Sequence, residues 1–153
     1  MIDAATILVA DDSADDVELL KRAIQKAGIK NPIRSLTDGL QVIDFLKDSS
    51  SLTDSDAACP LLMLLDLNMP RCTGFAVLRW LREQPHLQNL PIIVVSNSDQ
   101  PSDIEKSFRL GAHGYWVKPS RFEDLQKLAL DLKERLTDVV RRVALEPSMA
   151  VPA

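Results

Sequence analysis

Short apolar runs alternate along the chain with longer stretches in which apolar residues recur every three or four positions. The clearest runs hold three to five residues and lie at 6–10, 61–65, 92–95 and 115–117, and a weaker one lies at 33–36. A run that is apolar at successive positions is typical of a strand buried on both faces, as in a parallel sheet. The weaker run predicts an edge strand. The longer stretches predict amphipathic helices.

Capping residues and glycines mark where these helices begin and end. Ser13 is placed as the N-cap of the first helix, and Gly28 and Gly111 as the ends of the first and fourth helices. The other helices are expected from residue 39, at 74–82 and at 120–143, and residues 48–58 are expected to form an exposed loop. Alternating strands and helices predict the α/β class, a doubly wound parallel sheet with helices on both faces.

Composition narrows the possible classes of function. The 153 residues are enough for one domain with its own core, and the net charge is −4 with no run of Lys or Arg, so nucleic-acid binding is not expected. Asp3 stands where a signal peptide would have a basic residue, and no apolar stretch approaches the roughly 18 residues that span a bilayer. Cys59 and Cys72 lack metal-site spacing. We therefore expect a cytoplasmic protein that does not bind membranes.

Polar side chains follow four of the five predicted strands. Asp11 and Asp12 follow the first strand, Asp66 the third, Ser96 the fourth and Lys118 the fifth. In an open α/β sheet the carboxyl ends of the strands form the edge where ligands bind. Three carboxylates at one edge repel each other, and Mg²⁺ relieves this because it binds carboxylates together with phosphate oxygens. The edge therefore suits a phosphoryl group, with a carboxylate as its acceptor.

These residues, in this order and spacing, resemble the receiver domain of two-component response regulators over about residues 5–140. Four motifs carry the resemblance: the pair Asp11-Asp12, the sequence Asp66-Leu-Asn-Met-Pro with Gly74 four residues after the proline, Ser96, and Lys118-Pro119. The resemblance implies a flavodoxin-like sheet with strand order 2-1-3-4-5 and five helices. It also implies a receiver domain at 1–143 and a flexible tail at 144–153.

The resemblance also implies the chemistry of the site. Asp66 would accept a phosphoryl group from a partner histidine kinase. Asp12 would bind Mg²⁺ directly and Asp11 through water, while Asp66 and the backbone carbonyl of Asn68 would complete the protein ligands. The domain would catalyse its own phosphorylation and dephosphorylation and would not otherwise be an enzyme.

Other residues would sense or admit the phosphoryl group. Ser96 would donate a hydrogen bond to it, Lys118 would pair with its charge, and the ring of Tyr115 would turn inward when Ser96 moves. The Lys118–Pro119 bond is expected to be cis, as is typical of the family. Asn97 departs from the Ala or Gly that the family usually has there, so its amide is expected to restrict access to the site.

Two segments resemble a subgroup of the family. The loop at 48–58 and the connector at 85–91 are similar to those of single-domain response regulators that serve bacterial phytochromes. The resemblance makes a bacteriophytochrome the candidate kinase. Because only about ten residues follow the last helix, we expect signalling by conformational change and protein binding rather than through an output domain.

The last predicted helix has apolar residues at the a and d spacing of a heptad. At about 1.5 Å per residue it would span roughly 36 Å, which is longer than the sheet edge it must cover. We predict a homodimer through this helix and the fifth strand, with Trp116 as an exposed anchor beside Phe122, Leu132, Leu136, Val139 and Val143. A helix that only covers the sheet needs the same apolar stripe, so this interpretation stays open as well.

Two other functions remain open at this point. One is a Mg²⁺-dependent phosphohydrolase with Asp66 as nucleophile, although Asn68 cannot supply the general acid that such enzymes have two residues after the nucleophile. The other is a receiver-like interaction module that is never phosphorylated, which has no need of three clustered acids. Asp15 and Asp16 are interpreted as solvated acids favoured in a first helical turn.

Overall fold

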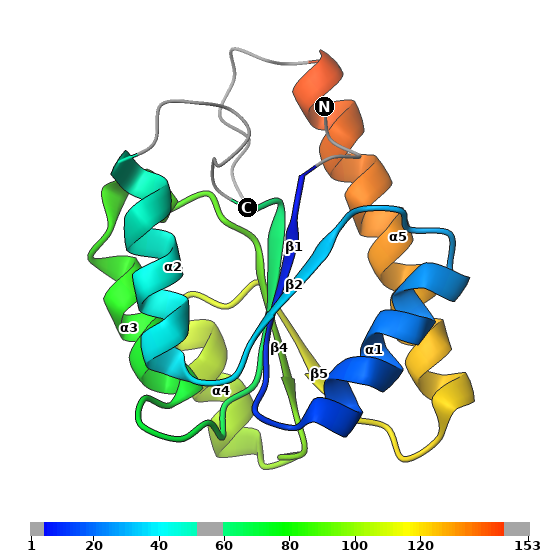
Figure 1. The fold of residues 1–153 in the computed structure, drawn as a ribbon, viewed down its shortest axis with the longest axis horizontal. Coiled ribbons are helices and arrows are strands. Elements are labelled where there is room, and N and C mark those ends of the chain that lie inside the picture. Colours follow the sequence, from blue (N-terminus) through cyan, green and yellow to red (C-terminus); the bar gives the residue numbers. More distant parts are fainter. Residues whose placement is uncertain (1–4, 52–59, 146–153) are drawn as a thin grey trace.

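Five parallel strands form one sheet through the centre of the protein (Figure 1). The computed structural model describes the backbone of residues 5–51 and 60–145 and the side chains of residues 5–47 and 60–136. The strands are β1 (Ile7–Ala10), β2 (Ile33–Leu36), β3 (Leu62–Leu65), β4 (Ile92–Ser96) and β5 (Gly114–Val117). Their order is β2-β1-β3-β4-β5, and each neighbouring pair is parallel. The predicted fold class and strand order are confirmed.

Helices cover both faces of this sheet. They are α1 (Ala14–Lys26), α2 (Gly39–Ser51), α3 (Gly74–Arg82), α4 (Pro101–Arg109) and α5 (Phe122–Leu145), with a short 3₁₀ helix, η3 (Pro85–Leu87), before β4. Figure 1 shows α1 and α5 on one face and α2, α3 and α4 on the other. None of the helices in the described ranges combines the length and the apolar character that crossing a membrane requires.

Alternate residues of each central strand enter the two cores. In β1, Ile7 and Val9 pack with α1 and α5, whereas Leu8 and Ala10 pack with α2 and α3. Every residue of β1, β3 and β4 is buried, whereas the edge strands β2 and β5 each have exposed positions. Burial on both faces explains why the central strands have uninterrupted apolar sequences.

The expected helix signals are present where the sequence predicts them. The Ser13 side chain accepts a hydrogen bond from the backbone N–H of Asp16 and caps α1. Gly28 and Gly111 follow α1 and α4 with φ of 90° and 108°, values that glycine adopts without strain.

Two predicted boundaries are wrong. α2 continues to Ser51, so the first four residues of the predicted 48–58 loop are helical. Each residue added to an existing helix gains a backbone hydrogen bond, so a polar sequence without periodicity does not end it. α5 runs to Leu145, two residues past its predicted end. The rest of the predicted loop, residues 52–58, and residues 146–153 of the predicted tail lie outside the described residues.

The predicted dimer interface is also wrong in part. Trp116 is not an exposed anchor, because only 6% of its surface is accessible and it packs in the core with α1 and α5. Neighbouring strand residues point to opposite faces, and in β5 it is Val117 that is exposed. Leu132 is buried in the same core, and Phe122 and Leu136 pack against it. The side chains of Val139 and Val143 lie outside the described residues.

Candidate functional site

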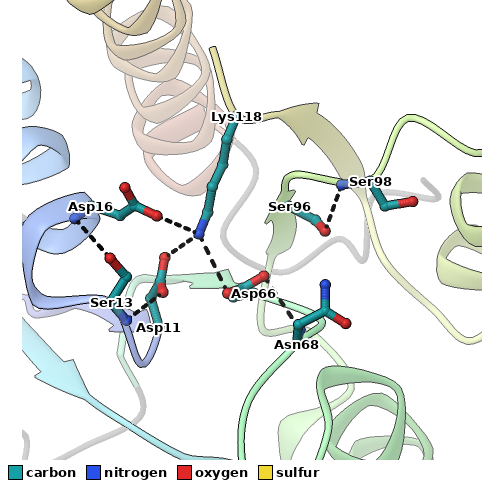
Figure 2. Close-up of polar contacts among 8 residues, drawn as sticks. All are labelled: Asp11, Ser13, Asp16, Asp66, Asn68, Ser96, Ser98 and Lys118. Atoms are coloured by element: carbon teal, nitrogen blue, oxygen red, sulfur yellow. Dashed lines mark hydrogen bonds and ion pairs between the residues drawn. The ribbon is translucent and has the colours of Figure 1, made fainter. Parts of the chain in front are cut away.

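Four of the polar residues predicted at the strand ends, Asp11, Asp66, Ser96 and Lys118, lie together at the carboxyl edge of the sheet (Figure 2). The backbone N–H of Asp66 donates to the carbonyl of Ala10 at 2.8 Å, and that of Lys118 donates to the carbonyl of Ser96 at 2.7 Å. These bonds continue the pairing of the strands and place the side chains beside each other. Figure 2 shows Asp66 between Asp11 on one side and Ser96 on the other, as the strand order β1-β3-β4 requires.

Three carboxylates at this edge could hold one cation. Asp11, Asp12 and Asp66 each offer an oxygen, and these oxygens lie within 4.8 Å of one another. Asp11 and Asp66 are buried, whereas Asp12 is exposed. Hard divalent cations favour several carboxylate oxygens and keep the remaining positions for water or phosphate. The donor set therefore fits a divalent cation that is open to solvent on the side of Asp12.

The ammonium group of Lys118 lies among the acids and contacts three of them. Its Nζ is 2.8 Å from Asp11 Oδ2, 2.9 Å from Asp16 Oδ2 and 3.4 Å from Asp66 Oδ2. Burial alone would lower the pKa of Lys118, but the hydrogen bonds to Asp11 and Asp16 and the nearby negative charges raise it above its ordinary value. Lys118 therefore supplies a fixed positive charge beside Asp66.

The Asp66 carboxylate itself is only loosely held. Its Oδ1 accepts from the backbone N–H of Asn68 at 3.4 Å and its Oδ2 from Lys118 at 3.4 Å, both long for hydrogen bonds. Burial raises the pKa of Asp66 to about 6, with Lys118 acting against this rise and Asp11 adding to it. At neutral pH the Asp66 carboxyl is therefore mostly ionised. No hydrogen-bond donor among the described residues lies close to it, since both contacts are 3.4 Å long.

The loop after Asp66 explains the glycine of the predicted motif. The backbone N–H of Gly74 donates to the carbonyl of Leu67 at 2.9 Å, which folds the loop back on itself. A Cβ added at Gly74 would lie 2.3 Å from the Asp66 carbonyl oxygen and 2.8 Å from Leu67 Cα. Only glycine allows α3 to begin this close to the strand that carries Asp66. The Asn68 side chain is exposed.

A second group of contacts joins Ser96 to Tyr115. Ser96 is fully buried, and its hydroxyl accepts from the backbone N–H of Ser98 at 3.2 Å. The hydroxyl of Tyr115 donates to the carbonyl of Ser98 at 2.7 Å. The ring is therefore directed toward the loop after β4, and Asn97 in that loop is exposed.

The predicted cis bond is absent. None of the peptide bonds between described residues is cis, so the Lys118–Pro119 bond is trans. The trans form of a bond before proline is favoured by about 0.5–1 kcal/mol. Lys118 contacts Asp11, Asp16 and Asp66 with the trans bond. These ion pairs therefore do not require the cis isomer.

The sequence interpretation missed one member of the site, Asp16. The sequence predicts a solvated acid at the start of a helix, but the Asp16 side chain contacts Lys118, which lies 102 residues further along the chain. The local signal is an N-cap serine followed three residues later by an acid, Ser13-x-x-Asp16, which is typical of the start of a helix. That pattern predicts the position of the helix and does not identify a distant partner.

Comparison with known proteins agrees with this architecture. The family model for the response regulator receiver domain matches residues 7–130. The chain belongs to this family. Its sequence is 31% identical over 122 residues to response regulator Rcp1 of Synechocystis sp., covering 80% of this chain and 82% of that protein.

Two solved structures extend the comparison of this receiver domain. The phosphorylated cyanobacterial phytochrome response regulator RcpA is similar with a TM-score of 0.77 and 25% identity, covering 89% of this chain and 96% of that chain. The Mn²⁺-bound form of response regulator Rcp1 is similar with a TM-score of 0.72 and 27% identity, covering 97% and 99%. The predicted family is confirmed: the protein is a receiver domain of two-component signalling, with phytochrome-associated relatives.

Proposed function

We propose that this receiver domain accepts a phosphoryl group on Asp66 from a phosphohistidine of a partner kinase. A carboxylate oxygen of Asp66 forms the new bond to phosphorus while the phosphorus–nitrogen bond breaks, and the histidine nitrogen keeps the electron pair. The observation that carries the proposal is the Asp66 carboxylate, buried, mostly ionised and held by two contacts of 3.4 Å. Only these two long hydrogen bonds have to be given up before the carboxylate attacks the phosphorus atom.

We propose Mg²⁺ as the cofactor. Asp11, Asp12 and Asp66 would hold it, with the backbone carbonyl of Asn68 as a further ligand. The acidic cluster supports this, as does the Mn²⁺ in the solved structure of Rcp1. When bound, the cation would neutralise charge on the phosphoryl oxygens. Lys118 would add a second positive charge, since its Nζ already lies 3.4 Å from Asp66 Oδ2.

The proposed response to phosphorylation runs from Ser96 to Tyr115. A phosphoryl group on Asp66 offers oxygens to the Ser96 hydroxyl, which now accepts from the backbone of Ser98. Turning that hydroxyl toward the phosphoryl group would move the loop to which Tyr115 is hydrogen-bonded. We include Asn97 as a control on access, with faster loss of the phosphoryl group expected in Asn97→Ala. An unchanged lifetime would remove Asn97 from the proposal.

The proposal also names partners and place. A bacteriophytochrome kinase is the candidate donor, because relatives of this receiver domain are phytochrome response regulators. The cytoplasm is the proposed compartment, and the unit proposed to act there is the receiver domain, predicted at 1–143 and extended by α5 to Leu145, with the tail after it.

We retain a homodimer as part of the proposal, through the end of α5 rather than through Trp116. Figure 1 shows this end of α5 extending beyond the strands. Sedimentation of both forms at high micromolar concentration tests this, and two monomers would contradict it.

Phosphorylation by a small donor tests the central claim. The protein is incubated with acetyl phosphate or phosphoramidate, with and without Mg²⁺, and its intact mass is measured beside that of Asp66→Asn. We expect one phosphoryl adduct that requires Mg²⁺ and is absent from the variant. If a cognate kinase also leaves the wild type unmodified, the domain is an interaction module that is not phosphorylated.

A further inference from the structure

Lys118 has as many close acceptors as it has protons to donate. An ammonium group has three N–H donors, and Nζ lies within 3.4 Å of one oxygen each of Asp11, Asp16 and Asp66. The contacts with Asp11 and Asp16 are short, at 2.8 and 2.9 Å, and the contact with Asp66 is the long one. The ammonium is therefore anchored by two acids and directs its remaining donor toward Asp66.

The two anchoring acids differ in what else they contact. Asp11 uses Oδ2 for Lys118 and Oδ1 to accept from the backbone N–H of Ser13 at 2.9 Å. It is also one of the three acids that lie close enough to hold a cation. Asp16 is outside that cluster. A cation would therefore compete with Lys118 for Asp11 and would leave the contact with Asp16 intact.

The position of Asp16 is set by the start of α1. Its backbone N–H donates to the Ser13 hydroxyl, and the next residue, Val17, is buried in the core with α5. These contacts hold the first turn of the helix against the sheet. Figure 2 shows the Asp16 side chain extending from this turn toward Lys118. The Asp16 side chain is 40% exposed while that of Lys118 is 11% exposed, so the ion pair is only partly open to solvent.

We propose that Asp16 is a positioning residue for phosphoryl transfer, which anchors the Lys118 ammonium over Asp66 when Asp11 turns to the cation. This inference rests on the proposed function. Asp16 contacts neither the phosphoryl group nor the cation; it acts through Lys118. With Asp16 in place, the third N–H of Lys118 remains directed at the oxygens of a phosphoryl group on Asp66.

A surface ion pair without a positioning role would differ in its effect on phosphorylation and not in its effect on stability. A partly exposed pair contributes little to stability, so removing Asp16 changes unfolding only slightly in either case. What separates the two is whether phosphorylation depends on this carboxylate or only on the total charge. Asp15 provides the control, because it is an exposed acid in the same helical turn.

The experiment compares Asp16→Asn, Asp15→Asn and Asp16→Glu with wild type at saturating Mg²⁺. Phosphorylation by phosphoramidate is followed by intact mass. We expect Asp16→Asn to slow it about two- to five-fold, the range for losing a partly exposed ion pair. Asp15→Asn should match wild type, and Asp16→Glu should recover part of the rate because it restores the carboxylate.

A second readout does not depend on phosphorylation. The ammonium signal of Lys118 is recorded by proton–nitrogen NMR without Mg²⁺ and is assigned by its loss in Lys118→Arg. It should broaden through faster exchange with water in Asp16→Asn and remain unchanged in Asp15→Asn.

Equal rates in the two asparagine variants, or a faster rate in Asp16→Asn, would overturn the positioning role while leaving the proposed function intact. If wild type forms no adduct with phosphoramidate or a cognate kinase, both fail together.

Discussion

Asp38 and Asp66 are buried acids at the same edge of the sheet, yet their surroundings are opposite in kind. Asp38 is 2% exposed and Asp66 5% exposed. Asp38 Oδ1 accepts from the backbone N–H of Gln41 at 2.9 Å, and its Oδ2 accepts from the Arg71 guanidinium at 2.7 Å. The contacts of Asp66 with Asn68 and Lys118 are both 3.4 Å.

The pKa values of the two acids shift in opposite directions. The hydrogen bond from Gln41 lowers the pKa of Asp38, and although burial opposes it, Arg71 adds to the lowering. For Asp66 burial dominates and raises the pKa to about 6. Burial therefore disfavours the charge on both acids, but short donors more than offset this at Asp38, and Asp66 lacks such donors. Asp38 is a helix cap, whereas Asp66 is left able to bind a cation or a phosphorus atom.

The largest expected effect is on stability without metal. Asp66→Asn should raise the free energy of unfolding by up to about 3 kcal/mol at pH 8, since a shift of about two pKa units corresponds to this. Because the folded-state pKa of Asp66 is raised from 3.8 to about 6, stability falls as the pH rises between these two values and stays at the lower level above them. The gain should therefore shrink as the pH falls from 7 toward 4. Urea unfolding in EDTA across this range measures it, and a gain that is the same at pH 5 and pH 8 would contradict it.

Mg²⁺ should offset the loss of stability that the ionised Asp66 causes. A ligand at 100 times its dissociation constant stabilises the folded state by about 2.7 kcal/mol. Wild type should gain stability on adding Mg²⁺, more at pH 8 than at pH 5, because protons compete for Asp66. Asp38→Asn is the matched control and should keep this gain, whereas Asp66→Asn should lose most of it. Thermal melts with and without Mg²⁺ provide the measurement, and an equal gain in both variants would place the cation elsewhere.

The comparison also shows what local sequence can and cannot predict. The strand that ends just before Asp66 is visible as an apolar run, and the loop after it needs Gly74 because the backbone passes too close for a Cβ. Both features depend on neighbouring residues. The local sequence around Asp38 gives no sign of its ion pair, because the partner Arg71 lies 33 residues away. The contact of Asp16 with Lys118 cannot be predicted locally for the same reason, because the two residues are 102 positions apart.

The sequence also does not predict which face of the sheet each side chain of β5 points to. Alternation in a strand predicts that Tyr115 and Trp116 face opposite sides, but both sides of this sheet are covered by helices. Which side has room for an indole depends on α1 and α5, and the structure places Trp116 there. The cis bond before Pro119 was expected from family resemblance alone, and the chain itself has no signal that distinguishes the two isomers.

Asp38→Asn should act in the opposite direction to Asp66→Asn. It removes the charge that the cap and Arg71 stabilise, so the unfolded fraction should rise roughly five- to thirty-fold. A lowered folded-state pKa contributes stability above the unfolded value of about 3.8, and that contribution is lost only as the pH falls below it. The loss should therefore be the same at pH 5 and pH 8. Urea unfolding at both values checks this, and a loss that grows between them would contradict it.

The smallest expected change in the free energy of unfolding concerns Arg71, which links Asp38 to the loop after Asp66. Arg71 belongs to the loop after Asp66, pairs with Asp38, and has a left-handed φ of 64°. Arg71→Ala and Arg71→Gly both remove the guanidinium, but only glycine adopts this φ without strain. Glycine also has more freedom to lose on folding, so the net advantage of Arg71→Gly over Arg71→Ala should be about 0.5–1 kcal/mol.

Both variants should be less destabilised than Asp38→Asn. The Arg71 side chain is 67% exposed, so its charge is already well hydrated, and Asp38 keeps its bond from Gln41. Urea unfolding of the three variants in one buffer gives the order directly. If Arg71→Ala proves as costly as Asp38→Asn, the ion pair rather than the helix cap holds Asp38 ionised. The charge on Asp38 would then depend on Arg71 in the loop that follows Asp66, which would couple the surroundings of the two acids.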